Sequence, residues 1–334
     1  MNANDTNDPT RLSVSGMRRY AECGYAFKLH REGAPRRISA TTWYGGLVHR
    51  IIQRAYAGAA PTDAHEQVWA EECGSILAAL EQWSDLHLAY QASGRPNTKA
   101  REAWLVRHPD YTTLAEHLLT YQTGVLGLYT WAQRATVQAF YLRSRTLVRE
   151  HGDELLLPNP VLVEGNLVAA LPDGGELAPV TPAADDGDDE PRPYGLLQGI
   201  ISSTTVVGVP DVVAYDPDAR RWRVADYKTA KTVLTPDTLR EDAQLGVYLV
   251  LLHQAGIIPT GATVEIGHLY VSDHVEAVWV DAGDLVGTLP RRLAAQVEQT
   301  RVLVEAGIFM PVKGLLNGYA DRCAGCSFAH VCDA

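Results

Sequence analysis

Two residues at the end of one predicted strand carry side chains that can do chemistry together. The stretch RVADYKTAK, residues 223–231, finishes an apolar run with Asp226 and Lys228. Alternate side chains of a strand share a face, so this carboxylate and this ammonium lie side by side while Tyr227 points to the other face. Such a pair forms either a strand-end ion pair or a site that holds a third group. The tripeptide by itself favours the ion pair.

A second carboxylate lies fifteen residues earlier, at Asp211 in the predicted strand stretch GVPDVVAY. Hydrolysis of a phosphodiester requires neutralised charge on the phosphate and an activated in-line water. Mg²⁺ and Mn²⁺ prefer oxygen ligands, among them carboxylates. Asp211 and Asp226 on adjacent strands therefore predict a divalent-metal site. There Lys228 can orient the attacking water or stabilise developing negative charge.

This set resembles the motif of the PD-(D/E)xK nuclease superfamily, spelled here by Pro210, Asp211, Asp226 and Lys228. The resemblance implies a metal-dependent deoxyribonuclease. It also implies a restriction-endonuclease-like α/β core, in which a mixed central sheet is flanked by helices.

Two helical motifs extend the resemblance to the RecB-like and CRISPR-associated exonucleases of this superfamily. QLGVY fits their Q-x-x-x-Y motif and places Gln244 and Tyr248 on one helix face, beside the active site in that family. GLVH fits their G-x-x-H motif, which makes His49 a metal ligand together with Asp211 and Asp226. Without this context, the pair would be polar residues of an amphipathic helix and His49 a core or boundary histidine.

Two further residues have supporting roles in this prediction. Glu164 matches an acidic position that the family often shows one strand before the first aspartate. Arg240 lies one helical turn before Gln244 on the same predicted helix, where it can reach a phosphate.

The cysteines predict a metal cluster. The tail CAGCSFAHVC contains Cys323, Cys326 and Cys332 in C-x2-C-x5-C spacing, and Cys23 lies near the other end of the chain. Closely spaced thiols in a cytosolic protein indicate metal binding rather than disulfides. Four thiolates suit either a 4Fe–4S cluster or tetrahedral zinc. Cys73, on a predicted helix, reads as a buried or boundary thiol.

One cysteine near the start and three at the end resemble the iron–sulfur arrangement of AddB-type and CRISPR-associated nucleases. That resemblance favours a structural 4Fe–4S cluster, held by Cys23, Cys323, Cys326 and Cys332, that joins the N- and C-terminal parts. The sequence departs from the family in one place, because Gly24 stands where a proline commonly follows the first cysteine.

Hydrophobic periodicity predicts helices first and an α/β region afterwards. Strands are expected in 161–171, 206–217, 220–229, 264–270 and 276–280, and helices from Ser13 or Ser15 towards Cys23, around 45–58, over much of 61–152, at 235–256 and at 285–306. The expected organisation is a disordered tail at 1–11, an N-terminal helical region at 12–155, a nuclease core at 156–308 with an acidic loop at 172–193, and a cysteine segment at 309–334.

Composition and charge exclude few classes of protein. The 334 residues are 46% hydrophobic, which suffices for a sizeable core. The net charge of −11 argues against a nucleic-acid partner, but seven acids fall within the loop 172–193 and a basic stretch lies at 16–37. No signal peptide or membrane span is expected, so the predicted location is the cytoplasm.

The predicted function is a metal-dependent exonuclease that cleaves DNA at single-stranded ends in repair, CRISPR adaptation or phage DNA processing. The sequence has no phosphate-binding loop of the helicase type, so unwinding would come from a helicase or from a recombination or CRISPR adaptation partner. Two alternatives are a catalytically weak DNA-end-binding subunit and an iron–sulfur redox protein. The redox alternative gives Asp211, Asp226 and Lys228 no role.

Overall fold

The chain divides into two compact units, of which the first is built from two separate stretches of sequence. Unit 1 comprises residues 1–34 and 153–334, and unit 2 comprises residues 35–152. The computed structural model describes residues 11–34, 39–71, 134–168, 181–182, 195–283, 289–310, 323, 326–329 and 331–332. Among these residues, no helix is long and apolar enough to cross a membrane.

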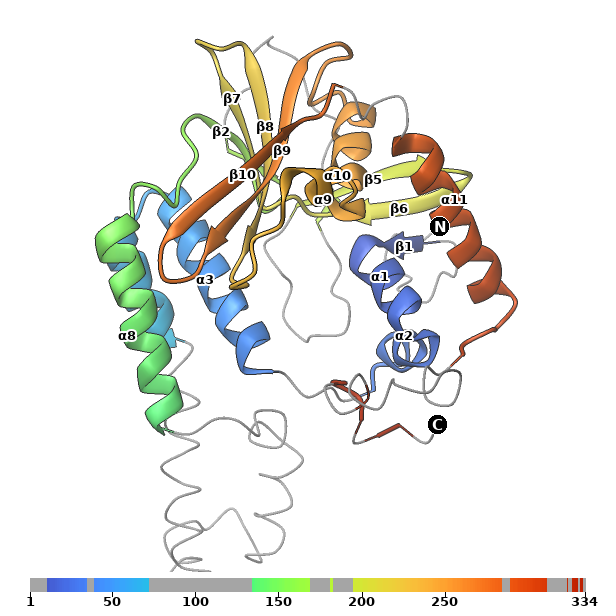
Figure 1. Cartoon of the computed structure of the whole chain (residues 1–334), viewed down its shortest axis with the longest axis horizontal. Coiled ribbons are helices and arrows are strands. Elements are labelled where there is room, and N and C mark those ends of the chain that lie inside the picture. The colour runs from blue at the N-terminus through green and yellow to red at the C-terminus, as the bar shows by residue number, and fades with distance from the viewer. Residues whose placement is uncertain are drawn as a thin grey trace, which may run out of the picture. The chain divides into compact units, whose positions relative to one another are not determined.

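A six-stranded mixed sheet forms the centre of unit 1 (Figure 1). Its order is β10-β9-β8-β7-β2-β3, with bounds β2 Pro160–Val163, β3 Asn166–Leu167, β7 Val212–Asp216, β8 Arg221–Lys228, β9 Thr263–Val271 and β10 Val275–Asp281. Only the β8–β9 pair is parallel, and the other neighbours are antiparallel. Because β8 and β9 run in the same direction, the ends that carry Lys228 and Tyr270 lie side by side.

Two helices connect the parallel strands and return the chain to the end of β8. Thr235 caps the short α9, Pro236–Leu239, by accepting a hydrogen bond from the Thr238 N–H. Asp242 then caps α10, Ala243–Gln254, by accepting from Gln244 and Leu245. A βαβ crossover requires a helix of this kind, and its first turn lies near the carboxyl end of the preceding strand.

A second sheet packs on the other side of α10. Its order is β1-β6-β5-β4, with β1 Arg11–Ser13, β4 Thr181–Pro182, β5 Gly195–Ile201 and β6 Thr204–Gly208. Helix α10 contacts β8 of the large sheet and β5 and β6 of the small one. This position explains why α10 is apolar on nearly all sides, with Leu245, Val247 and Leu251 fully buried. Helix α11, Leu289–Glu305, packs beside it.

The N-terminal helices pack against residues 308–310, which follow α11. Helix α1, Val14–Glu22, is capped by Ser13, and α2, Gly24–Arg31, follows directly. The Tyr20 hydroxyl donates to the Ile308 carbonyl at 2.5 Å, and the rings of Phe27 and Phe309 stack at 6.4 Å. At Gly24 a Cβ would lie 3.0 Å from the Met310 nitrogen, so any larger residue here would press on the backbone that crosses it.

Unit 2 contains helices around an aromatic core. Helix α3, Ala40–Tyr56, is capped by Ser39, a second helix covers 61–71, and α8 spans Arg134–His151. The rings of Trp43 and Trp69 meet edge to face at 5.7 Å. Buried Ser144 accepts hydrogen bonds from the Trp69 indole and the His65 Nε2, both at 3.0 Å. These contacts tie the 61–71 helix to α8.

The α/β class of the prediction is confirmed, since mixed sheets are flanked by helices, but three expectations about elements are wrong. The strands form two sheets rather than one, because the chain leaves the small sheet after Gly208 and enters the large one at Val212. The predicted strand 161–171 turns back at Glu164 and Gly165, where both φ angles are positive. The single helix at 235–256 is two helices, because Asp242 starts a new one.

The other described elements follow the predictions. Ser13 starts the first helix, Gly256 follows α10 with a φ of 71°, and β8, β9 and β10 lie where expected. Strands β1, β4 and β5 were not expected. The long helix predicted across 114–135 and most of the acidic loop 172–193 lie outside the described residues.

Candidate active site

The two aspartates of the predicted motif come together at the start of β7 and the end of β8. These strands are antiparallel neighbours, with Val212 opposite Ala225, so Asp211, the residue before β7, lies beside the last residues of β8. The Asp211 Oδ2 accepts a hydrogen bond from the Tyr227 backbone N–H at 2.6 Å. Asp211 and Asp226 are 8% and 3% exposed, so both carboxylates are desolvated and must be balanced by positive charge or hydrogen bonds.

One glutamine side chain joins the predicted catalytic residues into a network. The Gln244 Nε2 donates to the Asp226 Oδ1 and to the Tyr248 hydroxyl, both at 2.8 Å. The Gln244 Oε1 accepts from the Lys228 Nζ at 3.1 Å. Lys228 also forms an ion pair with the Asp226 Oδ2. Because ammonium only donates and carboxylate only accepts, this pattern fixes the orientation of the amide between them.

Tyr248 sits beside several negative charges. Burial is the main reason that its pKa lies well above the usual value, and the charges of Asp226, Asp211 and Glu164 raise the pKa further. The phenol therefore stays neutral in the physiological range. Gly208 of β6 makes room for it, because a Cβ there would lie 3.0 Å from the ring.

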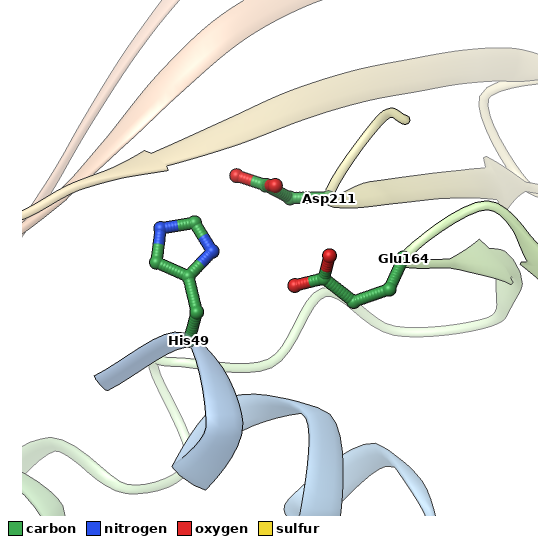
Figure 2. A group of neighbouring side chains, drawn as sticks. All are labelled: His49, Glu164 and Asp211. Atoms are coloured by element: carbon green, nitrogen blue, oxygen red, sulfur yellow. The ribbon is translucent and has the colours of Figure 1, made fainter. Parts of the chain in front are cut away.

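Glu164 lies beside Asp211 because of a tight turn. It occupies the turn between β2 and β3 with a φ of 47°, followed by Gly165 with a φ of 70°, as in a two-residue type I′ hairpin. The turn is tied to the first motif aspartate, since the Glu164 N–H donates to the Asp211 carbonyl at 2.8 Å. Ligand oxygens of the two side chains lie within 4.8 Å, and Figure 2 shows both carboxylates directed into one space.

Glu164 is therefore better placed for a metal than expected. A non-glycine residue with a positive φ is uncommon and carries strain of about 1 kcal/mol or more, which often marks functional sites. The sequence contained a signal for this turn in the dipeptide Glu164-Gly165, which interrupts the apolar run. Asp226, in contrast, is engaged with Lys228 and Gln244.

A histidine that sequence reasoning missed lies behind the motif. His268 of β9 is paired in register with Asp226, and the residue is 1% exposed. Its pKa is lowered because burial disfavours the charged imidazolium, although Asp226 and Asp242 oppose this effect. The available signal was its place in TVEIGHLYV, where it shares a strand face with Ile266.

The two remaining predicted residues belong to helices α3 and α9. His49 is on α3 in unit 2, half-buried and one helical turn after Gly46. Arg240 ends α9 and donates to the exposed Asp237 at 2.7 Å. Since the helix is interrupted after Arg240, the expected continuous stripe from Arg240 to Gln244 and Tyr248 does not exist.

The cysteines of the tail meet the N-terminal helices. Cys23 caps α2, and its Sγ accepts from the Ala26 N–H at 3.5 Å. The Cys326 N–H donates to the Cys323 carbonyl at 3.2 Å, which forms a turn. Cys23, Cys326 and Cys332 pack against one small hydrophobic cluster. Its members are Ala26, Leu29 and Phe328.

Comparison with known proteins identifies a family over nearly the whole chain. The model of the PD-(D/E)XK nuclease superfamily matches residues 11–333. A comparison with curated proteins gives no match. Among solved structures, the chain is similar to the crystal structure of a candidate exonuclease from Eubacterium rectale. That likeness has 12% identity and a TM-score of 0.43, and it covers 96% of this chain and 91% of the other.

Proposed function

Because this chain belongs to the PD-(D/E)XK nuclease superfamily, we propose that it hydrolyses phosphodiester bonds of DNA with Mg²⁺ or Mn²⁺. The observation that carries the proposal is the network in which Gln244 joins Asp226 and Lys228 next to Asp211. A buried ion pair alone would satisfy two charges. Here the further carboxylates of Asp211 and Glu164 lie close by, and an added cation would stabilise so many acidic groups in one place.

The donors suit a divalent ion. We propose that Asp211, Glu164 and His49 hold it together with Asp226; Figure 2 draws the first three. Carboxylate oxygens with one imidazole fit Mg²⁺ or Mn²⁺. When bound, such an ion neutralises phosphate charge and lowers the pKa of a coordinated water.

Lys228 has the role of positioning the attacking water in this proposal. Its ammonium is tethered by Asp226 and Gln244, while 27% of its side chain remains exposed. A tethered donor that still faces solvent can hydrogen-bond water or a phosphate oxygen without being reorganised during the reaction. Tyr248 stays a neutral phenol and holds the Gln244 amide in place.

Digestion of labelled DNA tests the proposed activity and its type. Linear and circular substrates, single- and double-stranded, are incubated with Mg²⁺, Mn²⁺ or EDTA. Loss of single-stranded linear DNA with intact circles supports the exonuclease proposal. EDTA should abolish this cleavage. Cut circles would assign an endonuclease instead. Tight binding of ends without cleavage in either metal would favour the DNA-end-binding alternative, in which a helicase or recombination partner does the remaining work.

We further propose that Cys23, Cys323, Cys326 and Cys332 hold a structural 4Fe–4S cluster. Support comes from the packing of three of them around one apolar cluster and from the backbone N–H that faces the Cys23 sulfur. Hydrogen bonds to sulfur are a common feature of such sites. Because the ligands are about 300 residues apart, binding energy would also stabilise the fold.

Replacing Cys326 by serine is expected to remove the brown colour of anaerobically purified protein and to lower its melting temperature. The physical reason is that the variant offers only three thiolates, so the cluster loses a ligand. Once the cluster is lost, the link that it makes between the two ends of the chain is lost too. Iron and sulfide analysis and a melting curve measure the two effects. Cys73→Ser is the matched control, and should keep the colour. Stoichiometric zinc without iron in the wild-type protein would contradict the cluster and leave the zinc alternative. Reversible reduction with electron transfer would favour the redox alternative.

Deleting Asp185–Glu190 is expected to leave the melting temperature unchanged and to tighten DNA binding several-fold at low salt. These acids lie outside the described residues, and the expectation rests on their charge alone. Removing negative charge reduces repulsion of phosphates, and salt screens that repulsion. Fluorescence anisotropy at two salt concentrations measures the DNA affinity. A deletion of equal length within 97–102, a segment with both charge signs, serves as control; unchanged affinity at low salt for Asp185–Glu190 would contradict the prediction.

A further inference from the structure

A line of polar groups connects β9 to the first turn of α10 behind the proposed active site. On β9, His268 and Tyr270 are register partners of Asp226 and Lys228. Both β9 side chains are almost fully buried. Burial of a polar group in an apolar core costs free energy unless the group is hydrogen-bonded, so the partners of these two side chains need to be identified.

The hydrogen-bond directions along this line follow from the donors available. The Tyr270 hydroxyl accepts from the Leu234 N–H at 2.9 Å, which leaves its own hydrogen to donate to the His268 Nδ1 at 3.3 Å. A neutral imidazole that accepts at Nδ1 carries its hydrogen on Nε2. That nitrogen faces the Asp242 Oδ2 at 3.6 Å, beyond direct hydrogen-bond distance. In the described part of the chain, Nε2 has no other hydrogen-bond partner.

Asp242 controls the geometry of the residues that follow it. Its Oδ1 accepts from the backbone N–H groups of Gln244 at 2.8 Å and Leu245 at 3.1 Å. The other oxygen, Oδ2, is the one that faces His268. One carboxylate therefore links the orphaned imidazole N–H to the helix turn that carries Gln244. An N–H aimed at a carboxylate in a buried region attracts it directly or through one water.

We propose that His268 is a positioning residue. Through Asp242 it holds the first turn of α10, so that the Gln244 side chain keeps the side chains of Lys228 and Asp226 in place. This inference rests on the nuclease proposal and adds a residue to it. His268 touches neither substrate nor metal in this account. Its effect passes through the position of the Gln244 amide, whose distances to Lys228 and Asp226 are 3.1 and 2.8 Å.

Three variants test the proposal by steady-state cleavage kinetics. His268→Leu is expected to lower kcat by about tenfold to a hundredfold, with KM nearly unchanged, because a small displacement of catalytic groups costs rates of this size. His268→Gln should recover most of kcat, since its amide can replace the imidazole N–H. Asp242→Ser keeps a helix cap but lacks the oxygen that faces His268, so it should show the same kcat loss.

The control is His253→Leu, which removes a histidine from the far end of α10 that contacts the Ile258 carbonyl at 2.9 Å. It should reduce stability but leave kcat unchanged. Full kcat in both His268→Leu and Asp242→Ser would overturn the inference. So would an equal kcat loss in His268→Gln and His268→Leu. If the leucine variant does not fold, the glutamine and serine variants decide alone.

Asp226→Asn, assayed in parallel, separates the two proposals. Loss of cleavage in Asp226→Asn with normal kcat in the His268 and Asp242 variants leaves the nuclease site standing and rejects the positioning role. Normal cleavage in Asp226→Asn rejects the nuclease site itself.

Discussion

Replacing Asp226 by asparagine is expected to lower kcat/KM for DNA cleavage by about a thousandfold, equivalent to about 4 kcal/mol of transition-state stabilisation. Asparagine keeps the shape and one acceptor oxygen, so the hydrogen bond from Gln244 can persist. It removes the negative charge that pairs with Lys228 and that a metal would use. Cleavage of labelled single strands gives the rate, and anisotropy in EDTA should show DNA affinity within a few-fold of wild type.

Asp218→Asn is the matched control, because this aspartate lies exposed in the turn after β7. Cleavage by Asp226→Asn within tenfold of the wild-type rate would reject the proposed site. A double-mutant cycle with Lys228→Met adds a sharper criterion. Since the two residues act as one unit, the double variant should be little worse than either single one, whereas independent residues would give additive losses.

Replacing Gly24 by valine is expected to destabilise unit 1 by about 2 to 3 kcal/mol, the upper part of the range typical of overpacked sites. Already a Cβ would lie 3.0 Å from the Met310 nitrogen and 3.3 Å from the Met310 oxygen and the Phe309 Cα. All three are backbone atoms and cannot rotate away. The melting temperature should fall by about 4 to 12 °C, measured by circular dichroism.

Gly46→Val is the control for this substitution, because Gly46 also lies within a helix but a Cβ added there would meet no described atom within 4 Å. Its melting temperature should stay within about 2 °C of wild type, since valine has no lower helix propensity than glycine. A similar small change at Gly24 would show that the Phe309–Met310 backbone does not cross α2 as described.

Local patterns predicted much of the candidate site. Alternation along β8 placed Asp226 and Lys228 on one face, and an interval of four placed Gln244 and Tyr248 together. Both rules depend on neighbours within one element, so tertiary packing did not disturb them. The contact between the two elements, through the Gln244 amide, agrees with what the family resemblance implied.

Features that depend on distant pairing could not be read from the sequence. His268 lies opposite Asp226 only through the parallel register of β8 and β9, which nothing in either strand specifies. The small sheet includes β1 only because this strand pairs with β6, a partner far along the chain. The turn at Glu164 and the helix break before Asp242 were visible as Glu-Gly and Asp-Ala signals, but apolar periodicity on either side outweighed them.

The order of synthesis has a consequence for how this molecule can be assembled. Arg11 pairs with Thr205, so β1 leaves the ribosome about 190 residues before its partner strand exists. At about 5–20 residues per second, the apolar side chains of Leu12 and Val14 wait for about ten seconds or longer without their native neighbours. Unit 2 is contiguous, and the ribosome completes it during this interval. In a nascent chain of this protein, β1 therefore stays unpaired until β6 has been synthesised. Shielding of its apolar side chains by a chaperone would matter most during that interval.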